Sequence, residues 1–103
     1  MNSEVINKIK EIKKEYEKEG FIILGIFGSC AREEETTEND IDILYETTEE
    51  FQKKFKGMAY FGKIYDIKEN LGKILGKEVD IADKEALNPI GRKYILPEVI
   101  YVA

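Results

Sequence analysis

The sequence predicts an α/β fold in which helices pack on a small mixed β-sheet. Three features predict it: a leading segment with apolar residues at helical spacing, an apolar run of strand length at residues 21–27, and later segments that alternate between helical and strand patterns. A chain of 103 residues is long enough for one hydrophobic core. We therefore expect a single domain over residues 1–103.

The first half of the chain is expected to contain a helix and two strands. Residues 3–19 have an amphipathic helical pattern that ends at Gly20. The run 21–27 is apolar on both faces, which is typical of a strand inside a covered sheet. A short polar helix over 30–35 and a polar loop precede the second strand, which is predicted over 40–46.

Two helices are predicted next. Thr47 or Thr48 can cap a short helix. Gly57 and Gly62 bracket a break, and Gly76 ends a longer helix that starts near residue 60. The inner positions expected on these helices are Phe51, Phe55, Met58, Phe61, Ile64, Ile67, Leu71 and Ile74.

The last part of the chain is expected to add a strand and a helix. The strand is predicted over 77–82. A helix begins at Pro89, because proline suits the first helical position, and Pro97 closes it before an extended segment over 98–102. Most tyrosines are expected in the core or at an interface, among them Tyr60, Tyr65, Tyr94 and Tyr101.

Composition narrows the chemistry and the location of the protein. The formal charge is −5 and the sequence has no long basic run, which argues against direct binding of nucleic acid. There is no histidine, so carboxylates must supply any acid–base or metal chemistry. The single cysteine, Cys30, the lack of a secretory pattern and the lack of a long apolar run lead us to expect a cytoplasmic protein.

A glycine–serine pair followed by two aspartates is the most informative feature of the sequence. Gly28 and Ser29 follow the first strand and therefore lie at a strand-to-helix corner, where free backbone N–H groups can bind phosphate. Asp40 and Asp42 are two residues apart on the next predicted strand, so their side chains share one face. Two carboxylates in this arrangement can hold one or two divalent cations.

Asp80 is the third candidate carboxylate. It lies between Val79 and Ile81 in a predicted strand that should be buried, where an unpaired charge is costly unless a metal or a partner compensates it. Three carboxylates on neighbouring strands suit two-metal nucleotidyl transfer, with the ions ~3.5–4 Å apart. Two alternatives stay open: the Asp40–Asp42 pair can be a solvated surface, and Asp80 can be a strand-end residue that faces solvent.

Two segments carry a resemblance to a known family: Gly28–Glu34, with the sequence GSCAREE, and Asn39–Leu44, with the sequence NDIDIL. Together they resemble the nucleotidyltransferase signature of the DNA polymerase β superfamily. The short chain and the Ala31–Arg32 pair are most similar to its minimal nucleotidyltransferase (MNT) subgroup, and the resemblance extends over nearly the whole chain. It implies the nucleotidyltransferase fold, in which helices pack on a small mixed sheet.

The resemblance also implies a role for each matching residue. Gly28 and Ser29 match positions that bind the β- and γ-phosphates of the nucleotide. Asp40 and Asp42 match the metal-binding pair, and Asp80 matches the third carboxylate. These matches imply two Mg²⁺ ions as cofactors and ATP as the nucleotide donor.

Three residues near the phosphate corner carry less information. Arg32 can contact a phosphate or form a surface ion pair with a neighbouring glutamate. Glu33 departs from the family pattern, because many relatives have glycine at this position. Cys30 is interpreted as a small buried residue.

Many MNT proteins are antitoxins that silence a HEPN ribonuclease toxin by transferring AMP from ATP to a tyrosine, and the resemblance implies this activity and this partner. The lack of room for a second domain in 103 residues supports this expectation, because antibiotic nucleotidyltransferases and polymerases carry extra domains. Two alternatives remain: an MNT-like binding module that neutralises its partner by contact, and a small-molecule nucleotidyltransferase that acts as a homodimer.

Overall fold

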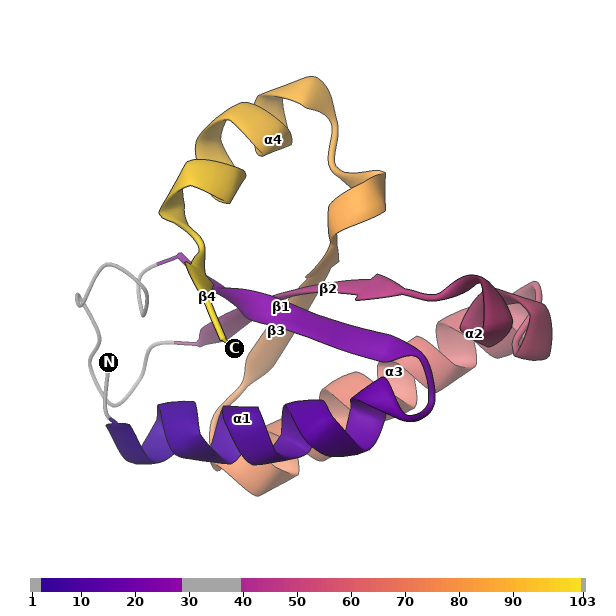
Figure 1. Cartoon of the computed structure of the whole chain (residues 1–103), viewed down its shortest axis with the longest axis horizontal. Coiled ribbons are helices and arrows are strands. Elements are labelled where there is room, and N and C mark those ends of the chain that lie inside the picture. The colour runs from indigo at the N-terminus through magenta and orange to yellow at the C-terminus, as the bar shows by residue number, and fades with distance from the viewer. Residues whose placement is uncertain (1–2, 29–39, 103) are drawn as a thin grey trace.

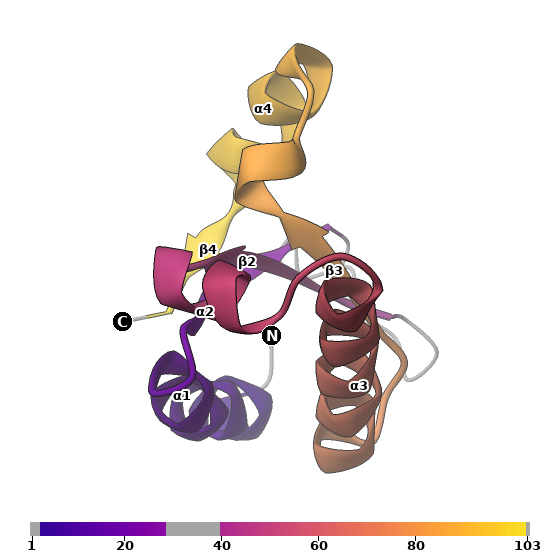
Figure 2. The same ribbon diagram turned by 90° about the vertical axis from the view of Figure 1, so that its right-hand side faces the viewer.

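The computed structural model describes residues 3–28 and 40–102. Within this part of the chain, four strands form a mixed sheet in the order β3-β2-β1-β4, with β2 and β3 parallel and the other pairs antiparallel. Helices α1 and α3 lie on one face of the sheet, and α4 lies on the other (Figures 1 and 2). The predicted α/β class with a small mixed sheet is therefore confirmed.

The elements follow the chain in the order α1 (Ser3–Glu17), β1 (Phe21–Phe27), β2 (Ile41–Thr47), α2 (Glu49–Lys54), α3 (Met58–Leu75), β3 (Val79–Asp83), η1 (Lys84–Ala86), α4 (Pro89–Ile95), η2 (Leu96–Glu98) and β4 (Ile100–Tyr101). The predicted order is confirmed for the described residues, with the ends of several elements shifted by a few residues, as is common where helices and strands end. The helix predicted over 30–35 lies outside the described residues. No helix in the described part is long and apolar enough to cross a lipid bilayer.

Gly20 joins α1 to β1 in a conformation that only glycine adopts readily. Its φ is +93°, and an added Cβ would collide with the hydroxyl oxygen of Thr48. Thr48 caps α2, since its side chain accepts a hydrogen bond from the backbone N–H of Phe51 at 3.2 Å. The backbone N–H of Thr48 also donates to the carbonyl of Gly20 at 2.9 Å, so this contact fixes the start of β1 against the start of α2.

The hydrophobic core lies between the sheet and the face formed by α1, α2 and α3. Phe21 is its aromatic centre: it stacks on Tyr45 with ring centroids 4.6 Å apart and contacts Phe51 at 6.3 Å. Ile41 and Ile43 are fully buried on the same face of β2. The alternation predicted for the second strand, with its isoleucines in the core, is therefore confirmed.

The predicted inner face of α3 is wrong at several positions. Met58 is 85% exposed and Phe61 is 67% exposed, whereas Ile67, Leu71 and Leu75 are buried. Helical spacing allows two adjacent stripes on this sequence, and the structure uses the one that carries Leu75 rather than Ile74, which is 43% exposed. The physical reason is that the direction of the helix is set by its contacts with β3 and α1.

The two glycines predicted to bracket a break behave differently. Gly57 directly precedes α3 with φ +60°, a conformation that favours glycine, and it separates α2 from α3 as predicted. Gly62 lies inside α3, so the prediction of a break there is wrong. Gly76 ends α3 in the left-handed conformation with φ +67°, which confirms the predicted stop.

Leu71→Ala and Phe61→Ala distinguish the two faces of α3. Leu71 is fully buried, so we expect its truncation to lower the free energy of unfolding by about 2–5 kcal/mol. The exposed Phe61 should contribute less than about 1 kcal/mol. Chemical denaturation of both variants measures the difference, and equal losses would contradict the observed orientation of the helix.

Tyr45 provides a second test of the core. Burial raises the pKa of the Tyr45 phenol far above its usual value, and the nearby Tyr60 and Asp83 raise it further. Above pH ~10, the ordinary pKa of tyrosine, this phenol can ionise only in the unfolded chain, so the free energy of unfolding should fall as the pH rises. The Tyr45→Phe variant should lose this part of the pH dependence in denaturation experiments. Ionisation of all six tyrosines in a chain that remains folded by circular dichroism would contradict the prediction.

Candidate functional site

Asp42 and Asp80 lie side by side on the face of the sheet opposite the core. Asp42 is paired with Phe27 of β1 on one side and with Asp80 of β3 on the other. Paired residues on neighbouring strands point to the same face, and their strands are about 5 Å apart. The strand pairing thus brings together two of the three predicted carboxylates, and we call this surface the site face.

Asp40 lies immediately before β2, and its side chain is half-buried. The next residue, Ile41, donates its backbone N–H to the carbonyl of Glu78 at 3.0 Å, which ties this end of β2 to the residue before β3. Asp40 is therefore two residues from Asp42, with the buried Ile41 between them. This spacing is the one expected for two carboxylates that serve the same face.

Gly28 brings the phosphate corner predicted from the sequence against the Asp42 carboxylate. It follows β1 with φ +78°, a conformation that side chains with a Cβ rarely adopt. A Cβ added there would collide with Oδ2 of Asp42, so this carboxylate occupies the space that a side chain would fill. The glycine is required both by its backbone conformation and by the close approach of Asp42.

Asp80 is exposed, so the expectation that it is a buried carboxylate is wrong. The reason is topological: β3 is an edge strand of the sheet, and Asp80 lies near its beginning on the site face. Its alignment with Asp42 does not depend on burial. The argument for its role therefore rests on strand pairing rather than on the cost of a buried charge.

No group of three or more acidic, histidine or cysteine side chains within residues 3–28 and 40–102 is already arranged to hold a metal ion. Carboxylates without a cation between them repel each other, which favours side-chain conformations that point apart. The backbone positions of Asp42 and Asp80 are nevertheless adjacent. Carboxylate oxygens are also the ligands that Mg²⁺ prefers, so the chemistry of these residues suits this ion.

The remaining candidates from the phosphate corner lie outside the described residues. These are Ser29 and Arg32, together with the neighbouring Cys30 and Glu33. The assignment of Ser29 and Arg32 to the nucleotide phosphates therefore stays a prediction from the sequence, as does the interpretation of Cys30 as a small buried residue.

The site face also contains an aromatic residue whose position the sequence did not indicate. Tyr101 of β4 is paired with Gly25 of β1, and Gly25 is paired with Leu44 of β2, two residues beyond Asp42. Tyr101 is 59% exposed, so it does not lie in the core, and the alternative that it lies at an interface stays a prediction. The apolar Val102 next to it is a signal that the sequence analysis missed: Val102 is buried, and alternation along a strand turns neighbouring residues to opposite faces.

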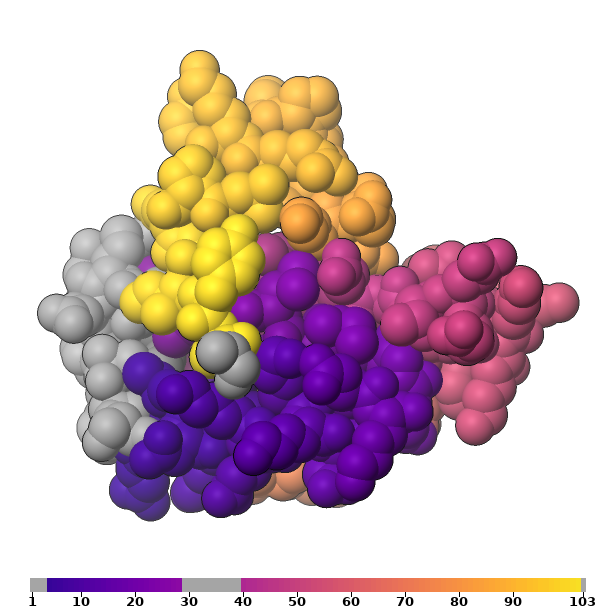
Figure 3. All heavy atoms as spheres, viewed as in Figure 1, coloured from indigo at the N-terminus to yellow at the C-terminus, as the bar shows by residue number. Residues whose placement is uncertain are grey.

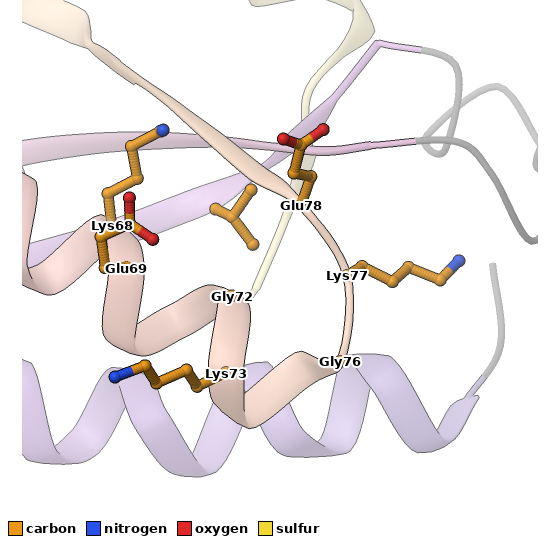
Figure 4. Close-up of a pocket in the computed structure, with 8 residues that line it drawn as sticks. Lys68, Glu69, Gly72, Lys73, Gly76, Lys77 and Glu78 are labelled. Atoms are coloured by element: carbon orange, nitrogen blue, oxygen red, sulfur yellow. The ribbon is translucent and has the colours of Figure 1, made fainter.

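A cavity of about 400 Å³ lies elsewhere, between the end of α3 and the start of β3 (Figure 4). It is lined by Lys68, Glu69, Gly72, Lys73, Gly76, Lys77, Glu78 and Val79. Figure 4 shows that the side chains of Lys73 and Lys77 point in opposite directions. None of the three candidate aspartates lines this cavity.

Comparison with known proteins agrees with this geometry. A protein of Methanocaldococcus jannaschii named "Putative protein adenylyltransferase" is 39% identical over 100 residues, which cover 96% of this chain and 92% of that protein. The protein adenylyltransferase MntA of Thermococcus cleftensis is 34% identical and covers 90% of this chain and 83% of its own length. A solved structure described as a "putative minimal nucleotidyltransferase" superposes with a TM-score of 0.69 at 27% identity, covering 97% of this chain and 95% of that one.

The resemblance to minimal nucleotidyltransferases is therefore confirmed by sequence and by fold. Residues 7–102 match the family described as "Polymerase beta, Nucleotidyltransferase", a range that includes Gly28 and all three candidate aspartates. With Asp42 of β2 paired with Asp80 of β3 and Gly28 against the Asp42 carboxylate, the chain belongs to the polymerase beta nucleotidyltransferase family.

Proposed function

We propose that this protein transfers AMP from ATP to a hydroxyl group of a partner protein, with a tyrosine of a HEPN-type ribonuclease toxin as the acceptor. The observation that carries the proposal is the alignment of Asp42 with Asp80 on the site face, with Gly28 against the Asp42 carboxylate. The relatives named protein adenylyltransferases support AMP as the transferred group and a protein as the acceptor. The tyrosine and the toxin rest on the resemblance to MNT antitoxins.

In this reaction the acceptor oxygen forms a bond to the α-phosphorus of ATP. The bond between that phosphorus and the oxygen that bridges to the β-phosphate breaks, and pyrophosphate leaves. The proton of the acceptor hydroxyl passes to Asp80, which lies at the open edge of the site face. The transfer therefore requires a carboxylate at the acceptor side and a binding site for pyrophosphate on the other side.

Residues on β2 and β3 would bind the metal ions, and residues that follow β1 would bind the phosphates. Asp40 and Asp42 would hold two Mg²⁺ ions, and Asp80 would complete the ligands on the acceptor side. When bound, such ions activate the attacking oxygen and stabilise the leaving pyrophosphate. Gly28 and Ser29 would bind the β- and γ-phosphates through backbone N–H groups, with Arg32 as a further phosphate contact.

A second function, neutralisation of a partner by contact alone, is compatible with the exposure of Asp80, which suits a cation site as well. An MNT-like binding module would not need the candidate carboxylates to converge. The two functions differ in what happens when a carboxylate is removed.

Asp42→Asn and Asp80→Asn test the transfer reaction. The protein is incubated with Mg²⁺, labelled ATP and the protein encoded by the neighbouring reading frame, and the label on protein is measured. Loss of a metal-binding carboxylate should lower the rate on the order of 10³-fold. Asp66→Asn, an exposed aspartate on α3, is the matched control and should leave the rate unchanged.

Two outcomes would count against the transfer reaction. A wild-type rate in Asp42→Asn would show that this carboxylate does not hold the reaction's metal. If no label reaches any acceptor and both variants still neutralise the partner, contact alone is the function.

Gly28→Ala tests the glycine corner. The added Cβ would displace the Asp42 carboxylate, so we expect the transfer rate to fall about 100-fold or more. Gly57→Ala is the matched control: Gly57 also has a positive φ, of +60°, but an added Cβ meets nothing within 4 Å. Both variants place a Cβ at a residue with positive φ, so an equal loss of activity would show that backbone strain, rather than the position of Asp42, is responsible.

A further inference from the structure

The position of Tyr101 follows from the register of three strands. Tyr101 pairs with Gly25, Gly25 pairs with Leu44, and Leu44 is two residues from Asp42 on β2. Tyr101 therefore lies on the site face, two strands away from Asp42 and on the β1 side, opposite to Asp80. With strands about 4.8 Å apart and a rise of about 3.4 Å per residue, the Cα atoms of Asp42 and Tyr101 are about 12 Å apart.

Contacts of β4 with β1 and with the core fix the backbone position of Tyr101. The backbone N–H of the next residue, Val102, donates to the carbonyl of Leu24 at 3.0 Å, and Val102 is buried in the core. A Cβ on Gly25 would collide with the carbonyl of Ile100, so β4 can approach β1 this closely only because residue 25 is glycine. Figure 3 shows this C-terminal segment, in yellow, at the surface of the molecule.

The aromatic ring of Tyr101 is accessible to a ligand. Its side chain is 59% exposed and makes no hydrogen bond or ring contact with the other described residues. Tyr94 of α4 is also exposed, but Lys93 lies over its ring, with Nζ 5.6 Å from the centroid. Tyr65 is exposed as well, on a helix that covers the opposite face of the sheet (Figure 2).

We propose that Tyr101 is a stacking platform for the purine base of the nucleotide donor. The inference rests on the proposed use of ATP: the triphosphate binds at the Gly28 corner, the α-phosphate lies near Asp42, and the base extends over the site face towards β4. The separation of about 12 Å between Asp42 and Tyr101 lies within the length of a nucleoside triphosphate. Tyr101 stacks on the face of the base through its aromatic ring, an interaction that is open to every base because each has a π-surface. It takes no part in the transfer of AMP.

The test compares ATP with inorganic tripolyphosphate, which has the charge of the phosphate chain but no base. Binding of each in the presence of Mg²⁺ is measured by calorimetry for the wild type, Tyr101→Ala, Tyr101→Phe and Tyr65→Ala. We expect Tyr101→Ala to raise the Kd for ATP about 10-fold and to leave the Kd for tripolyphosphate unchanged. Tyr101→Phe keeps the ring and should bind ATP as the wild type does, and Tyr65→Ala should do the same.

Each contrary result has a distinct meaning. An unchanged Kd for ATP in Tyr101→Ala overturns the stacking role and leaves the proposed function intact. An equal loss of ATP and tripolyphosphate binding in Tyr101→Ala overturns it too, because the residue would then act on the structure of the phosphate site. If the wild type binds neither compound, the proposed function fails together with this inference.

Discussion

The register of β2 within the sheet is the constraint on which the rest of the structure depends. Asp42 is the point where β2 is paired with both β1, through Phe27, and β3, through Asp80. A slip of one residue would turn Asp42 into the core and move Ile41 and Ile43, which are fully buried, onto the site face. The burial of the isoleucines therefore fixes the position of the carboxylate, and no separate interaction is needed to place it.

The two faces of the sheet have different tasks because they are covered differently. Helices α1 and α3 cover one face, where the Phe21–Tyr45 stack and the isoleucines form the core. On the other face, α4 has no buried residue and stands away from the body of the molecule (Figure 2). The aromatic and isoleucine core packs on one face. Leu44 is buried on the site face as well, whereas Asp80 and Tyr101, on the two edge strands, are exposed and accessible to a nucleotide and an acceptor.

Features that depend only on neighbouring residues in the sequence were predicted correctly. The first strand was predicted with its exact ends because a run that is apolar on both faces is bounded by Gly20 and Gly28, both of which have a positive φ. The end of α3 at Gly76 was also predicted, because glycine readily adopts the left-handed conformation that ends a helix. The aspartate pair was recognised because alternation along a strand is a local property as well.

Pairings between distant segments could not be predicted in this way. The stripe of α3 that faces the core depends on where β3 and α1 lie, so Phe61 and Ile74 were wrongly placed inside. The exposure of Asp80 depends on β3 being an edge strand, and that of Tyr101 depends on pairing between β4 and β1, which are far apart in the sequence. The phosphate-binding role of Ser29 and Arg32 remains a prediction, since both lie outside the described residues.

The exposure of Asp80, although it contradicts the expectation, suits a site that must bind a cation. Two like charges on directly paired residues destabilise a sheet, and the penalty grows as water is excluded. A buried group of three carboxylates would make folding dependent on the metal, as in small domains that are unfolded without their ion. At an exposed edge, water screens Asp80 from Asp42 until a cation arrives. The fold is then stabilised by the aromatic and isoleucine core on the opposite face, and the attraction between the cation and the carboxylates remains available for binding the nucleotide.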